Sequence, residues 1–136
     1  MEERPDLAAL LYPLVRVLIA AETPILAAHD LSMWGYSVLT ALDETPVRTQ
    51  AALAEAIGAD KSRIIGTLDE LQAADLIERS PDPDDRRVRL LSITAKGRRV
   101  RRTVRKSIRA YEDELLGTLP AADRTAFLRS LRALQQ

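Results

Sequence analysis

The chain of 136 residues contains no cysteine and only one histidine, His29. Without cysteine, it can hold no disulfide, thiolate metal site, thiol nucleophile or cysteine redox sensor. A single histidine argues against a histidine metal cluster and against a Ser-His-Asp triad. Aromatic residues are 4% of the chain, so the core must rest on Leu, Ala, Val and Ile. The abundance of Leu and Ala favours helices.

By residue type alone, no apolar run approaches the roughly 20 residues that span a bilayer. The start, MEERPDL, is acidic and lacks the basic and apolar regions of a signal peptide. We therefore expect a cytoplasmic protein. The length suits one domain over residues 1–136.

Charge is unevenly distributed, although the net charge is zero. Residues 1–45 carry two basic and seven acidic side chains, whereas residues 46–109 carry fifteen basic and nine acidic ones. A basic middle between acidic ends is typical of a module that binds a polyanion.

The first predicted helix, residues 7–28, is nearly all apolar. Its apolar positions recur at helical spacing and extend around the cylinder, which favours a dimer interface over a buried core helix. Pro13 and Pro24 are expected to kink or break it, since each removes a backbone donor. Capping residues predict further helices at residues 33–44, 50–58, 61–76, 95–119 and from 121. Their caps are Ser32, Thr49, Asp60 and Thr94.

A hairpin is expected between the fourth and fifth of these helices. Residues 76–79 begin it, and the tip SPDPDDRR, with two prolines and three aspartates, cannot continue a strand. The return strand, residues 88–94, is expected to point Val88, Leu90 and Ile93 inward, with an irregularity at Leu91. The fold class is therefore mainly α with a small β-hairpin wing: a winged helix-turn-helix over residues 31–94, between terminal helical extensions at residues 1–30 and 95–136.

The tip carries the most specific chemistry. An arginine at a hairpin tip can enter the DNA minor groove, where negative potential is concentrated. Asp85 precedes Arg87 by two residues and can hold it by a charge-assisted hydrogen bond. Alone, this motif is best interpreted as a solvated turn; after a helix pair, it indicates DNA recognition.

Residues 30–97 closely resemble the multiple-antibiotic-resistance regulator (MarR) family of winged-helix transcription factors. The matching residues are Thr49-Gln50-x-x-Leu53-Ala54, Gly58-x-Asp60-Lys61-Ser62, Leu71, Leu76-Ile77, Asp82-Pro83-x-Asp85-x-Arg87 and Leu90 to Gly97. The resemblance implies a homodimer built by the first and last helices, two recognition helices on a pseudo-palindromic operator in double-stranded DNA, and, in many members, a small-molecule effector. It implies no cofactor.

Two positions depart from the family pattern. Gly66 stands where many members carry a basic residue, which shifts recognition to the start of the helix and to the wing. Asp75 stands where the family usually has glycine, and aspartate tolerates the left-handed turn better than most residues. The predicted DNA-binding residues are Thr49, Gln50, Lys61, Ser62, Arg63, Thr67, Asp85, Arg86 and Arg87.

Arg63 is expected to read a base edge, because its fork matches the two acceptors of guanine. Lys61 is expected on phosphate, and Thr49 and Gln50 can anchor phosphate at a helix start. For each, a solvated surface residue is the alternative. In the basic run from Lys96 to Arg109, the first residues, Lys96, Arg98 and Arg99, can approach the DNA backbone. The later residues are interpreted as structural, paired with acidic side chains of the first helix region and of the partner.

The resemblance places an effector cavity between the first, second and fifth helices, where core packing is the competing interpretation. The candidates there are Tyr12, Arg16, His29, Trp34, Tyr36 and Tyr111. The function indicated is a dimeric, sequence-specific transcriptional regulator, a repressor relieved by a small molecule. The alternative is a winged-helix protein-interaction module without specific DNA binding. An enzyme is not expected, since Asp82, Asp84 and Asp85 make a poor metal cage at a hairpin tip.

Overall fold

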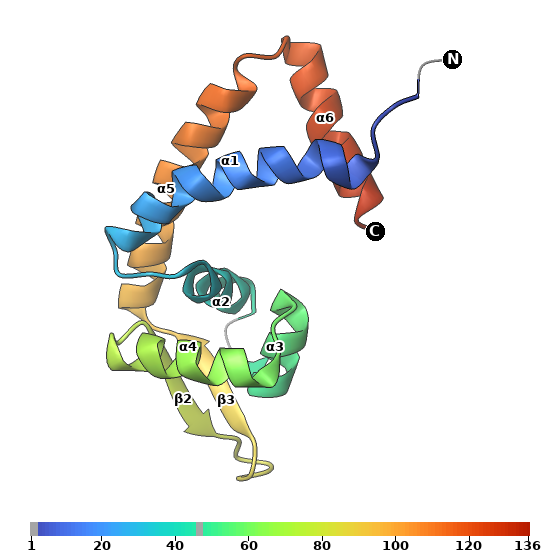
Figure 1. Ribbon diagram of the computed structural model, residues 1–136. Coiled ribbons are helices and arrows are strands. Elements are labelled where there is room, and N and C mark those ends of the chain that lie inside the picture. The colour runs from blue at the N-terminus through green and yellow to red at the C-terminus, as the bar shows by residue number, and fades with distance from the viewer. Residues whose placement is uncertain (1–2, 46–47) are drawn as a thin grey trace.

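The computed structural model describes residues 3–45 and 48–136, which form six helices and three short strands (Figure 1). The elements are α1 (Leu7–Ala27), α2 (Met33–Glu44), β1 (Arg48–Thr49), α3 (Gln50–Ile57), α4 (Lys61–Ala73), β2 (Ile77–Pro81), β3 (Arg89–Ile93), α5 (Ala95–Leu116) and α6 (Ala121–Leu134). The predicted fold class, mainly helical with a hairpin wing, is confirmed. The sequence also favours a short strand at Val47–Arg48; Val47 lies outside the described residues, and Arg48 begins β1.

All four predicted N-caps are confirmed. Each side-chain oxygen accepts the amide proton three residues ahead, at 2.8–3.2 Å, and so satisfies one of the donors that a helix start leaves open. The capping residues are Ser32, Thr49, Asp60 and Thr94. Gly58, at φ 70°, ends α3 and turns the chain into α4. Local sequence therefore fixes the helix-turn-helix boundaries at both ends.

The three strands form an antiparallel sheet in the order β1-β3-β2. Ile77 lies opposite Ile93 and Pro81 opposite Arg89. The expectation that the tip cannot continue a strand is wrong for Ser80 and Pro81. Because β2 is an edge strand, a residue without an amide proton fits there.

The inward face of β3 also differs from the prediction. Leu91 and Ile93 are its buried residues, whereas Leu90 is only half-buried and Val88 lies before the strand begins. The strand starts at Arg89 and alternates regularly from there. The inward position of Ile93 is therefore confirmed, whereas the inward positions of Val88 and Leu90 and the irregularity at Leu91 are wrong.

The hydrophobic core lies where α2, α3 and α4 meet the sheet and the first half of α5. Ile64, Leu68 and Leu71 of α4 and Val38, Leu39 and Leu42 of α2 are all buried. Leu53, Ile77, Leu91 and Val104 complete its centre. This core fixes α4 by one face and leaves its other face exposed.

Helix α1 lies largely outside that core. Leu26 is its one buried residue, while Leu7, Leu10 and Val17 are about half exposed. The helix continues through Pro13 and Pro24, so a break at either proline is wrong, while a kink there stays a prediction. The carbonyls that each proline leaves unpaired belong to exposed residues, where water replaces the lost hydrogen bond.

Helix α1 is also long and apolar enough to cross a membrane, with 21 residues and a mean hydropathy of 1.6 over its most apolar window. The expectation that no apolar run approaches such a length is therefore wrong. That estimate treated prolines and the two charged residues, Arg16 and Glu22, as interruptions. A helix at an interface between protein chains has the same apolar composition.

Helices α1, α5 and α6 form three sides of an open triangle at the end of the molecule away from the sheet (Figure 1). An apolar hollow of about 480 Å³ lies between them, walled by leucines and Phe127. Leu119, Leu128 and Leu134 of the α5–α6 end are exposed. A single copy of the chain thus leaves the inner faces of this end without full cover.

Candidate nucleic-acid interface

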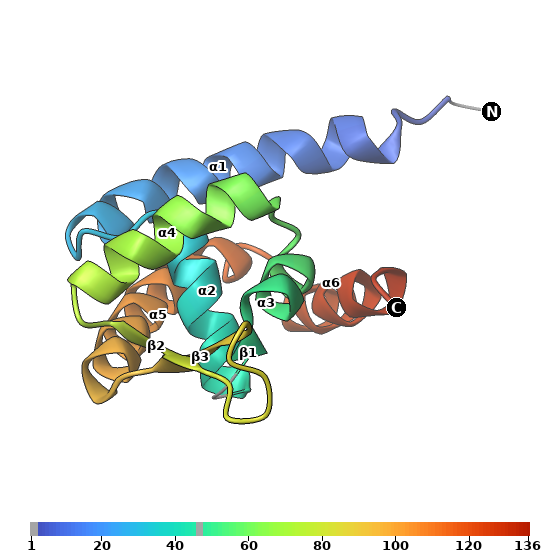
Figure 2. The same ribbon diagram turned by 90° about the horizontal axis from the view of Figure 1, so that it is seen from below.

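Helix α4 and the hairpin tip lie on the same side of the molecule, with α3 beside them (Figure 2). The first two turns of α4 present Lys61, Ser62, Arg63, Ile65 and Gly66 to solvent. Thr67 is half-buried, and its hydroxyl donates to the Arg63 carbonyl at 3.3 Å. Thr67 thus points along the side of the helix toward α2.

Asp60 organises the start of α4. Its carboxylate accepts the Arg63 amide proton at 2.8 Å and the Ser62 hydroxyl proton at 2.8 Å. The backbone hydrogen bond, followed by that of the hydroxyl, lowers the pKa of Asp60 below its usual value. Ser62 has therefore already donated its one proton and offers an incoming group only its acceptor lone pairs.

Arg63 lies over the indole ring of Trp34, with its guanidinium carbon 5.8 Å from the ring centroid. This is a cation–π distance, and it joins α4 to the first turn of α2. Arg63 is placed on the flank of α4 that faces Trp34.

The opposite flank of α4 faces the start of α3. Gln50, Lys61 and Ile65 line a shallow hollow of about 230 Å³ between the two helices. Gln50 begins α3 directly after the Thr49 cap. Thr49, Gln50 and Lys61 are therefore brought together at the two helix starts, as the prediction requires for anchoring phosphate.

The wing tip follows the predicted geometry. The Asp85 carboxylate accepts both the backbone amide and the Nε–H of Arg87, each at 3.2 Å. Asp82 accepts the Asp84 amide at 2.9 Å, so the acidic residues shape the loop. The Arg87 side chain is 91% exposed, and Arg86 is exposed beside it. The tip thus presents two cations to solvent, one of them held by a carboxylate.

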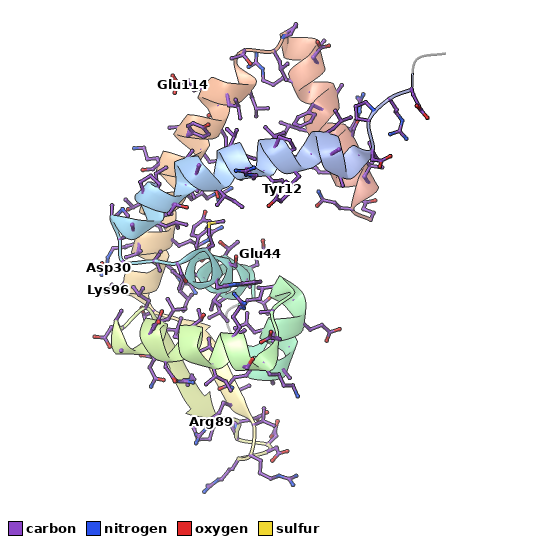
Figure 3. The ribbon with its side chains drawn as sticks, viewed as in Figure 1. Tyr12, Asp30, Glu44, Arg89, Lys96 and Glu114 are labelled. Atoms are coloured by element: carbon purple, nitrogen blue, oxygen red, sulfur yellow. The ribbon has the colours of Figure 1, made fainter. Side chains whose placement is uncertain are left out.

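Two further arginines, which the sequence did not single out, lie between α4 and the tip. Arg79, Arg89, Gln50 and Gln72 line a polar hollow of about 330 Å³. Arg79 pairs with Asp69 and donates to Gln72 at 2.6 Å, whereas Arg89 is exposed at the start of β3, next to the tip loop (Figure 3). The alternation of side chains along the strands is a signal that could have identified them. Arg79 lies opposite Leu91, and Arg89 is two residues before it, so all three side chains are on one face of the sheet.

The basic run at the start of α5 has structural partners. Arg101 donates to the Asp43 carboxylate at 2.9 Å and to Thr40 at 3.4 Å, and its side chain is 12% exposed. The Lys96 ammonium donates to the Ala74 carbonyl at the end of α4. Arg109 pairs with Glu112 within α5. Arg101 and Arg109 thus pair with carboxylates, as expected for the later part of the run, whereas the approach of Lys96 to the DNA backbone stays a prediction.

The six effector candidates are not gathered into one cavity. The apolar hollow between α1, α5 and α6 is lined by none of them. Tyr12 is 64% exposed on α1 (Figure 3), and Trp34 is engaged with Arg63. His29, Tyr36 and Tyr111 are half-buried, while Arg16 is exposed.

Within residues 3–45 and 48–136, no three His, Asp or Glu side chains are grouped so as to hold a metal ion. The Glu22 carboxyl, half-buried on α1, has its pKa raised by burial and by the nearby Glu112. This pair lies at the crossing of α1 and α5 and is remote from the α4 surface.

Comparison with known proteins places these features in a family. The model of the MarR family matches residues 31–88. The transcriptional repressor NicR of Pseudomonas putida is 31% identical over 99 residues, which are 73% of this chain and 63% of the repressor. The aligned stretch thus spans less than two thirds of that relative's length.

Two solved structures resemble the whole chain. The transcriptional repressor CouR, bound to a 23-mer DNA duplex, superposes with a TM-score of 0.87 at 27% identity, over 99% of this chain and 100% of that one. The regulator PcaV of Streptomyces coelicolor, in complex with its natural ligand, superposes with a TM-score of 0.74 at 28% identity, over 98% and 97%.

Proposed function

Because the chain belongs to the MarR family, we propose that it is a dimeric, sequence-specific DNA-binding regulator of transcription and not an enzyme. Its partner is double-stranded DNA with a pseudo-palindromic site, and its location is the cytoplasm. The observation that carries the proposal is the shared face of α4 and the wing, where Arg86 and Arg87 extend from the tip. A helix for the major groove and a cationic tip for the adjacent minor groove are the two elements that such recognition needs.

Dimerisation supplies the second recognition helix. Leucines and valines are exposed on α1, leucines are exposed at the α5–α6 end, and an apolar hollow lies between these helices. Apolar surface of this extent on a water-soluble chain marks an interface. We assign it to a second copy, because a two-fold symmetric partner places two α4 helices on two half-sites of one duplex.

The outcome proposed is repression, relieved by a small molecule. PcaV has been crystallised with its natural ligand, and NicR and CouR are named as repressors. For this chain, the effector set remains Tyr12, Arg16, His29, Trp34, Tyr36 and Tyr111. Trp34 is the member in direct contact with the DNA-facing helix.

The test is binding to the DNA upstream of the protein's own gene, against scrambled duplex of the same length, across a series of salt concentrations. A dimer that makes six to ten phosphate contacts loses about 10³–10⁵ in affinity between roughly 50 and 200 mM salt. Equal affinity for both duplexes at every salt concentration refutes sequence-specific binding.

The competing function, a winged-helix module that binds protein and not DNA, is motivated by Gly66, which leaves a gap in the basic surface of α4. Sedimentation of the protein with and without duplex separates the two. A stable complex of one dimer with one duplex argues against the protein-interaction module.

A further inference from the structure

The front of α4 contains an apolar side chain with no role in the fold. Ile65 is 49% exposed, although Ile64 and Leu68 beside it are buried. It borders the shallow hollow with Gln50 and Lys61. Singly exposed apolar side chains are common on protein surfaces, but this one stands on the face of α4 that the proposed function assigns to DNA.

Gly66, next to Ile65, leaves the surface of α4 open to close approach by a bound molecule. A Cβ added at residue 66 would have no atom within 4 Å, so packing does not demand glycine there. The φ of this residue is ordinary for a helix, so backbone strain does not demand it either. What glycine provides is a low helix surface next to Ile65, over which a base pair can approach the backbone closely.

The neighbouring polar side chains are already engaged. The Ser62 hydroxyl has donated its proton to Asp60, and Arg63 is stacked on Trp34, on the other flank of the helix. Farther along, Asp69 is paired with Arg79. Two side chains on this flank of α4 have no partner among the described residues. One is the Lys61 cation, and the other is the apolar side chain of Ile65.

We propose that Ile65 reads a thymine in each half-site through the 5-methyl group of the base, with Gly66 permitting the close approach. In the major groove, the thymine methyl is the one apolar group that a base pair presents, and an apolar side chain is its complement. This inference rests on the proposed function and adds to it a base preference that the basic residues do not supply.

The experiment begins with selection of a preferred site from random duplexes. Each thymine of the selected half-site is then replaced by uracil, which removes only the 5-methyl group. For the wild-type dimer, uracil at one position in each half-site is expected to reduce affinity about fourfold per half-site, which is the value of one buried methyl. Uracil at the other thymines serves as the internal control.

The same duplexes are measured with Ile65→Ala and Ile65→Val. The alanine variant is expected to bind the thymine and uracil sites equally, whereas the valine variant retains most of the discrimination. Circular dichroism and the dimer mass verify that both variants are folded. If no thymine is sensitive, or if Ile65→Ala keeps the sensitivity, the inference is overturned while sequence-specific binding stands. If no site is selected at all, the proposed function fails as well.

Discussion

The contact between Gly97 and the end of α4 gives a sharp stability prediction. Gly97 lies in the first turn of α5, and a Cβ there would stand 2.1 Å from the Leu76 carbonyl oxygen and 2.8 Å from Ile93. The Leu76 carbonyl already accepts the Thr94 amide at 3.1 Å, so neither side can move without loss. Gly97→Ala therefore requires α5 to shift by about 1 Å, a distortion that costs roughly 1–3 kcal/mol as overpacking.

Loss of the hydrogen bond between Thr94 and Leu76 adds about 1 kcal/mol, and the better helix propensity of alanine returns about 0.8 kcal/mol. We expect a net loss of roughly 1–3 kcal/mol in the free energy of unfolding. Gly66→Ala is the matched control, because it is also a glycine in a helix but has open space around it. It is expected to gain about 0.5–1 kcal/mol.

Urea unfolding of both variants and the wild type, at one protomer concentration and without DNA, measures the difference. The midpoint of Gly97→Ala should fall while that of Gly66→Ala rises. Equal midpoints for Gly97→Ala and the wild type would refute the reasoning, because they would mean that α5 does not pack directly on the Leu76 backbone.

Three further predictions concern charged residues. Arg87→Ala should weaken operator binding and reduce its salt dependence by about one ion per protomer, with the dimer intact. Lys106→Ala on α5 removes the same charge and serves as the control. An equal loss of operator affinity from both variants would contradict the role of the wing in DNA binding. Asp43→Ala leaves the half-buried Arg101 without its carboxylate and should cost about 1.5–3 kcal/mol in urea unfolding, while the exposed neighbour Glu44→Ala should stay within about 0.5 kcal/mol. Glu22→Gln should stabilise the dimer near neutral pH, because burial and Glu112 raise the pKa of the Glu22 carboxyl. The charged carboxylate destabilises the wild type above its folded pKa, and this loss of stability fades as pH falls toward the ordinary pKa of 4.5. A stabilisation by Glu22→Gln that is constant across this pH range would contradict the reasoning.

The parts of this fold that were predictable from sequence depend on local chemistry. Ser32, Thr49, Asp60 and Thr94 accept a backbone amide within their own helix turn, so their role is visible without tertiary structure. The left-handed turn at Asp75, with φ 60°, is confirmed for the same reason. The wing pair of Asp85 and Arg87 spans only two residues.

The errors come from tertiary context. The strand could include Pro81 because β2 is at the sheet edge, which depends on the order of strands. Whether α1 breaks at Pro13 depends on the exposure of the carbonyl it frees. The partner of Arg63 is Trp34, 29 positions away in the chain, so its orientation could not be obtained from the helix pattern.

The close packing of Gly97 on Leu76 also determines how motion passes through the molecule. Thr94 donates to the Asp75 carbonyl at 2.6 Å, and Lys96 donates to the Ala74 carbonyl at 2.9 Å. These hydrogen bonds connect the C-terminal end of α4 and the first turn of α5 into one rigid unit. A rotation of α5 at the far end of the molecule would carry α4 with it as a rigid arm. The spacing of the two recognition helices in a dimer would then be set by how α1, α5 and α6 pack, many residues away from any base.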